Sequence, residues 1–348
     1  MICATAMGAA SALVPLSAQA CKYEDTALAA QLRRFAETCG HVLCGSIHPS
    51  DPDVLKRGTS CDGDPLIALT ADWLQARFSG AVVIGEVHDN ASQHEVQANL
   101  LRSDPVPSPE DKAAIVFEQV RSDQQSGLDQ FALLQTRPAA PATLAEFKRL
   151  TNWDTSGWQQ YNYDPLLQAA IDLQLPLYAG DVPRATMLKV AKEGEAALPS
   201  DERARLKLDV PLGEANDAAS LATIEENHCG LMPKEALKPM AYAQRYRDAH
   251  LADATLNAAE RHGSAILITG NEHARTDRGA PWYIRQRAPD KKVVSVMLIE
   301  VEAGKTDPEA YVPRGPDGKP AADYIIFTPA APHEDQCAKM RERMQKKK

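Results

Sequence analysis

The sequence lacks long apolar runs, an excess of basic residues and closely spaced cysteine pairs. After residue 20, no stretch approaches the roughly 20 apolar residues that a membrane-spanning helix needs, so we expect a soluble mature chain. The net charge is −9, which argues against a nucleic-acid partner because no broad basic face is implied. There is no Cys-x-x-Cys pair, so a zinc site built from cysteines is not expected.

The first twenty residues have features of an export signal. Residues 7–18 are small and apolar, and Ala18-Gln19-Ala20 has the Ala-x-Ala form of a signal-peptidase site. No basic residue precedes them, which a start further upstream or an imperfect signal would explain. We expect residues 1–20 to be a signal peptide. Lipid attachment at Cys21 is the less favoured alternative, because Ala18 and Gln19 fit a lipoprotein signal poorly.

Six cysteines follow the expected cleavage site, and an even number in an exported chain favours disulfides. They are Cys21, Cys39, Cys44, Cys61, Cys229 and Cys337. The sequence alone does not determine their pairing. A bond between Cys44 and Cys61 would close the loop between them, which is rich in Pro, Gly and Asp.

Alternating strand and helix patterns predict one α/β domain at 67–330. Apolar runs predict strands at 81–84, 113–117, 175–179, 265–269, 293–300 and 324–327. Such runs separated by helical segments predict a mostly parallel sheet covered by helices on both faces. Helical insertions at about 123–172 and 185–261 predict a helical subdomain, or lid, over the carboxyl ends of the strands. Residues 21–66 form a cysteine-containing extension, and 331–348 a charged tail.

Two His-bearing tetrapeptides of the same form follow predicted strands far apart in the chain. They are Gly85-Glu86-Val87-His88 and Gly270-Asn271-Glu272-His273. Glu118 follows a third predicted strand, and Asp181 and Arg184 follow a fourth. Because the carboxyl ends of parallel strands converge on one crevice, we expect these side chains to share a site.

Carboxylates beside imidazoles suit acid–base catalysis or the binding of a hard cation. The candidate catalytic residues are Glu86, His88, Glu118, His273 and Arg278. The candidate metal ligands are His88, Glu118 and His273. Glu118 alone is equally well explained as a helix cap or a partner for an arginine, but the matching contexts of His88 and His273 are harder to explain structurally.

A second group of residues lies in the helical stretches and is rich in aromatic side chains. It comprises Trp153, Trp158, Tyr161, Tyr163 and His228. Such side chains line flat apolar ligands such as haem, with Tyr or His as the axial ligand. Composition alone favours the simpler interpretation, in which they pack the lid.

In order, these segments resemble the ChaN-like haem-binding uptake family. They are residues 85–90 with His94, 117–118, 152–158, 228–229, 243–248, 270–275 and 278–279. The resemblance extends from about residue 80 to residue 300. It implies a parallel α/β core with a helical subdomain, a location in the bacterial envelope as a periplasmic protein, and a role in haem or iron uptake. Haem or another small molecule is the implied ligand, and a homodimer is one implied arrangement.

The wider superfamily includes Tiki and TraB proteins and, more distantly, erythromycin esterases, so the resemblance also implies a second function. In Tiki-type proteins, paired Gly-x-x-His elements and a Glu support metal-dependent peptidase chemistry, and in the esterases a His and a Glu activate water. Glu86, His88, Glu118 and His273 occupy the corresponding positions here, and Arg278 would stabilise an oxyanion. A hydrolase using a divalent metal or a His/Glu pair is therefore the alternative, and whether the chain is an enzyme stays open.

Overall fold

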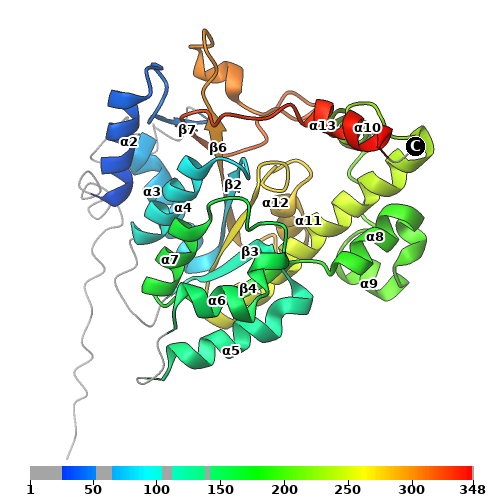
Figure 1. Ribbon diagram of the computed structural model, residues 1–348, viewed down its shortest axis with the longest axis horizontal. Helices are drawn as coiled ribbons and strands as arrows, with labels where there is room; N and C mark the ends of the chain where they lie inside the picture. The colour runs from blue at the N-terminus through cyan, green and yellow to red at the C-terminus, as the bar shows by residue number, and fades with distance from the viewer. Residues whose placement is uncertain (1–25, 52–64, 104–111, 138–141, 347–348) are drawn as a thin grey trace, which may run out of the picture.

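A computed structural model of the chain describes residues 26–51, 65–103, 112–137 and 142–346 (Figure 1). The predicted signal peptide, Cys21 and Cys61 lie outside the described residues. Within the part that is described, no helix is both long and apolar enough to cross a membrane.

A seven-stranded sheet forms the centre of the molecule, in the order β1-β7-β6-β2-β5-β3-β4 (Figure 1). The strands are β1 Ile47–Pro49, β2 Gly80–Glu86, β3 Ala114–Arg121, β4 Leu177–Asp181, β5 Ala265–Gly270, β6 Lys292–Glu300 and β7 Tyr324–Thr328. All neighbouring strands are parallel except β1, which is antiparallel to β7. The prediction of a mostly parallel sheet is confirmed. The short edge strand β1, in the N-terminal extension, was not predicted.

Helices cover both faces of the sheet, because successive strand residues point to opposite sides and both sides are apolar. Val82 and Ile84 of β2 pack into one core, and Ala81 and Val83 into the other. The helices are α2 Ala27–Thr38, α3 Pro65–Ser79, α4 Ala91–Arg102, α5 Gln125–Gln135, α6 Leu144–Leu150, α7 Asp164–Asp172, α8 Arg184–Glu193, α9 Ser200–Arg205, α10 Glu214–Asn227, α11 Lys234–His262, α12 Ala280–Arg287 and α13 Gln336–Gln345. The first core contains residues of α3 to α7, and the second residues of α8, α11 and α12.

The two helical insertions have different places in the fold. Helices α5 to α7 belong to the body, where α5 packs on β4, α6 on α5 and α7, and α7 on α4, whereas α8 to α10 and the beginning of α11 extend to one side as an arm (Figure 1). Helix α11 has 29 residues and connects this arm to the body, since it also packs on β3, β4 and β5. Residues on α11 therefore lie beside the carboxyl ends of the strands.

Two disulfides are present among the described residues. Cys39 is bonded to Cys44, and Cys229 is bonded to Cys337. The Cys44–Cys61 bond considered above, whose second cysteine lies outside the described residues, is not formed because Cys44 is bonded to Cys39 at the end of α2. Part of the predicted C-terminal tail is helix α13, which the second disulfide attaches to the arm.

Candidate functional site

The carboxyl ends of β2, β3 and β5 bring four of the predicted residues together. Both imidazoles approach the same carboxylate oxygen, Glu118 Oε1, His88 Nε2 at 3.9 Å and His273 Nε2 at 3.5 Å. Glu86 holds the other side of the His88 ring. Glu86, Glu118 and His273 are almost completely buried, whereas the side chain of His88 is 33% exposed. The site thus consists of three buried side chains and one accessible imidazole, that of His88.

His88 presents different surroundings at its two ring nitrogens. Nδ1 lies 2.9 Å from Glu86 Oε1, so the proton on this nitrogen is donated to the carboxylate. Nε2 makes no hydrogen bond among the described residues and is close to the position that a Cβ on Gly270 would occupy. The edge of Trp158 contacts the ring, with centroids 4.8 Å apart. Nε2 is therefore the nitrogen left for a ligand.

A set of buried donors holds the Glu86 carboxylate in its charged form. Tyr163 donates its hydroxyl proton to Oε1, Gln119 donates to Oε1 at 3.0 Å, and Gln97 donates to Oε2 at 2.6 Å. Burial on its own would raise the pKa of Glu86, but the hydrogen bond from His88 and the imidazole of His94 lower it below the ordinary value. The ionised carboxylate orients His88.

Glu118 is held just as firmly, on both oxygens. Oε2 accepts hydrogen bonds of 2.7 Å from the Thr269 hydroxyl and from the Gly270 backbone N–H, and Oε1 accepts one of 2.6 Å from Arg247. Burial opposes ionisation, but His273, His88 and Arg247 hold the pKa of Glu118 far below its usual range. A register shift between β3 and β4 at 117–121 is adjacent to this residue. Glu118 is a permanent negative charge at the centre of the site.

Helix α11 supplies two further charged residues. Arg247 forms a forked pair with Asp181, at 2.9 Å in its shortest contact, as well as the bond to Glu118. Asp248 accepts a hydrogen bond from His273 Nδ1 at 2.6 Å, and burial raises the pKa of its carboxyl to about 6. Each imidazole of the site is therefore oriented by its own carboxylate: Glu86 for His88 and Asp248 for His273.

A cavity of about 480 Å³ opens beside His88, between the strand ends and the start of the arm. Its walls are Trp158, Tyr161, Val182 and Met187 on the apolar side, and His88, Glu118, Asp181, Arg247, Arg121, Arg184, Ser156, Gly157 and Gln160 elsewhere. Its volume is within the range of small-molecule sites, about 300 to 1,000 Å³.

The predicted aromatic group is only partly in this cavity. Trp158 and Tyr161 line it. Tyr163 and Trp153 are buried and do not line it; their ring centroids are 5.7 Å apart, and the Tyr163 hydroxyl donates a hydrogen bond to Glu86. His228 lies at the end of α10, where Nδ1 is 2.8 Å from the carbonyl oxygen of Ile224. It does not line the cavity.

Arg278 also lies away from the large cavity. It pairs with Glu272 at 2.9 Å and lines a separate cavity of about 60 Å³ between α10 and α11. The structure therefore gives it a different environment from His88. The predicted role as an oxyanion-binding group stays a prediction.

The described residues contain no group of three or more His, Cys, Asp and Glu side chains suited to hold a metal ion. The physical reason lies at Glu118. Its first oxygen is already ion-paired with Arg247, and its second oxygen already accepts hydrogen bonds from Thr269 and the Gly270 backbone. The predicted set of His88, Glu118 and His273 is brought together, but as a hydrogen-bonded and ion-paired cluster.

The charged residues at the strand ends were predicted from the sequence, but the residues that hydrogen-bond to them were not. Gln97 and Gln119 carry no local signal beyond burial. Arg247 and Asp248 belong to segment 243–248, one of the segments that resemble the family, and this resemblance was the one feature of the sequence that could have pointed to them.

The structure is thus an α/β protein with a mostly parallel sheet, a helical arm and a cavity of small-molecule size lined by aromatic side chains and one accessible imidazole. A family model described as haem-binding uptake, Tiki superfamily, ChaN matches residues 73–284, and the chain belongs to this family. Its predicted family is thereby confirmed. No curated protein sequence matches the chain.

Two solved structures are similar to the chain. ChaN of Campylobacter jejuni with cofacially bound haem is 18% identical, with a TM-score of 0.54 over 73% of this chain and 89% of that chain. A mutant erythromycin esterase in its open conformation is 13% identical, with a TM-score of 0.39 over 84% of this chain and 86% of that chain. The first likeness supports the predicted α/β fold.

Proposed function

We propose that the chain binds haem in the cavity beside His88 and takes part in haem or iron uptake outside the cytoplasm. The observation that carries the proposal is the state of the His88 ring. Its Nδ1 is held by Glu86, and its Nε2 has no hydrogen-bond partner among the described residues while the side chain lines a cavity of about 480 Å³. Nε2 of His88 would hold the haem iron, and bound haem would supply the metal centre that accepts this nitrogen.

The surroundings of His88 suit this role. A carboxylate on the far nitrogen fixes the orientation of a ligating imidazole and strengthens it as a donor. Trp158, Tyr161 and Met187 offer apolar contact surface to a flat ring. Tyr161 is the second candidate axial ligand, because it lines the cavity, whereas the hydroxyl of Tyr163 is already bonded to Glu86.

Titration of the mature protein with haemin tests the proposal. The wild type should give a saturable shift of the Soret band. His88→Ala should weaken binding by at least about tenfold and change the position of the band, since loss of even a supporting residue costs about that much. His48→Ala is the matched control, because His48 pairs with Glu309 at the β1 edge and does not line the cavity. Tyr161→Phe tests the second ligand. A wild type without a saturable shift at micromolar haemin contradicts the proposal.

Ester or peptide hydrolysis is the second candidate function, and one observation favours it. The pair Glu86–His88 has the geometry of a general base oriented by a carboxylate. Hydrolysis by this pair requires turnover that is lost in His88→Ala and Glu118→Gln. If the protein binds haem but hydrolyses no compound of an ester and peptide panel, the hydrolase function is rejected and haem binding is retained.

A further inference from the structure

Two arginines line the large cavity but form no ion pair with the carboxylates of the site described above. Arg184 is the first residue of α8, is exposed and lines the cavity. Its side chain has neither a hydrogen bond nor an ion pair with any of the described residues. Arg121, the last residue of β3, lines the same cavity and approaches only the half-exposed Asp123, at 3.4 Å. The buried Nε of Arg121 has no hydrogen bond.

The third arginine of the cavity differs from these two. Arg247 is half-buried between Glu118 and Asp181, which accept hydrogen bonds from its guanidinium group. Those carboxylates give the floor of the cavity beside His88 a surplus of negative charge. An acidic group on a ligand is therefore repelled from the floor and attracted to Arg121 and Arg184.

We infer that Arg121 and Arg184 form the subsite for the acidic groups of the ligand, which are the two propionates of haem. The inference rests on the proposed function. Guanidinium groups bind carboxylates through paired, charge-assisted hydrogen bonds, and both arginines have donors available for this. With the ring against Trp158 and Tyr161, the two arginines fix which edge of the porphyrin enters the cavity and select porphyrins with free acids over neutral esters.

A metal-free porphyrin separates this subsite from axial ligation. The probes are protoporphyrin IX and its dimethyl ester, and binding is followed through quenching of tryptophan fluorescence. The wild type should bind the free acid at least about tenfold more tightly than the ester, the scale of one charge-assisted pair. Arg121→Gln and Arg184→Gln should each reduce this preference. The double variant should bring it to within about twofold while leaving the affinity for the ester nearly unchanged.

Arg149→Gln is the matched control, because Arg149 is exposed on α6 and pairs with Glu146 away from the cavity. Unchanged thermal unfolding of the variants shows that they fold. A wild type that binds haemin but does not prefer the free acid, or a double variant that keeps the preference, overturns the inference and leaves the proposed function standing. A wild type that binds neither haemin nor porphyrin overturns both.

Discussion

The proposed haem site makes binding depend on pH through the two ring nitrogens of His88. Burial on its own lowers the pKa of His88, but the charges of Glu118 and Glu86 raise it above the ordinary range of an imidazole. A proton on Nε2 competes with iron, and a raised pKa means that this competition begins at a higher pH than for a free imidazole. We therefore predict that haem affinity falls by roughly tenfold per pH unit below the folded-state pKa of His88.

Soret titrations at a series of pH values, from weakly alkaline to weakly acidic, measure this dependence. Glu86→Gln removes one of the charges that raise the pKa, so the midpoint should move to lower pH while affinity at alkaline pH also weakens. A midpoint that does not move in Glu86→Gln would show that Glu86 does not control His88.

The two glycines of the Gly-x-x-His elements make different demands on the site, and this can be tested. A Cβ on Gly270 would lie 2.7 Å from His88 Nε2, so Gly270→Ala should displace the ring and weaken haem binding. A Cβ on Gly85 would meet the side-chain oxygen of Asn271 and lie 2.8 Å from the Cβ of Ala274 in the core, so Gly85→Ala should instead cost about 1 to 3 kcal/mol of stability. Haemin titration and urea unfolding of both variants should show opposite patterns, and equal effects on both measurements would contradict this assignment.

At the scale of elements, the strands could be predicted from the sequence, but the residues that hold the side chains at their ends could not. A buried parallel strand is a local apolar run, so β2 and β5, and the His residues after them, could be found from the sequence. Arg247 and Asp248 come from the interior of α11, and they reach the strand ends only through packing. Tyr163 was predicted to bind haem. In the structure the loop before α7 lies close to the end of β2, so the hydroxyl of Tyr163 donates its hydrogen bond to Glu86. The three residues of β1 are too few for a pattern of their own.

Helix α11 contributes to stability through Arg247. Arg247→Met leaves Glu118 and Asp181 without their cation in a buried site, and removing one partner of a buried ion pair costs about 3 to 5 kcal/mol. Urea unfolding should show this loss, and Arg247→Lys should restore part of it. Arg149→Met, which removes an exposed pair on α6, should change the unfolding midpoint little. Equal midpoints for Arg247→Met and wild type would mean that α11 does not hold the strand ends through this residue.

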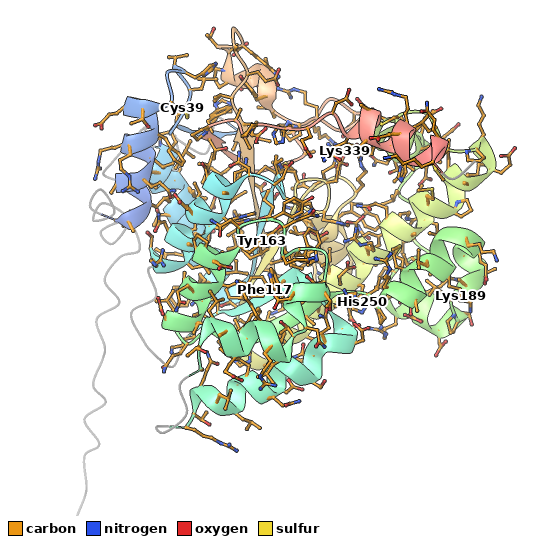
Figure 2. All side chains as sticks on the ribbon, viewed as in Figure 1. Cys39, Phe117, Tyr163, Lys189, His250 and Lys339 are labelled. Carbon is orange, nitrogen blue, oxygen red and sulfur yellow. A yellow bond between two sulfur atoms is a disulfide. The ribbon has the colours of Figure 1, made fainter. Side chains whose placement is uncertain are left out.

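At the scale of the whole molecule, the body and the arm differ in how they are stabilised. The body has two extensive apolar cores on the faces of the sheet. The end of the arm has a small separate cluster with only Ile224, Leu237 and Ala241 buried. The second disulfide joins α13 to Cys229, just after the end of α10, and Lys339 of α13 lies on the opposite side of the molecule from Cys39 (Figure 2). A covalent connection therefore matters more to the arm than to the body.

The two disulfides should differ in their contribution to stability because the loops that they close differ in length. Cys229 and Cys337 are 108 residues apart, and Cys39 and Cys44 are 5 apart. Loop-closure entropy predicts about 4.7 kcal/mol for the long loop and about 2 kcal/mol for the short one. Double Ser variants of each pair, compared by urea unfolding, should show the larger loss for the long loop. Amide hydrogen exchange should then be fastest in α10 and α13, with the sheet still protected. Equal losses for the two variants would mean that the arm is held by its own packing.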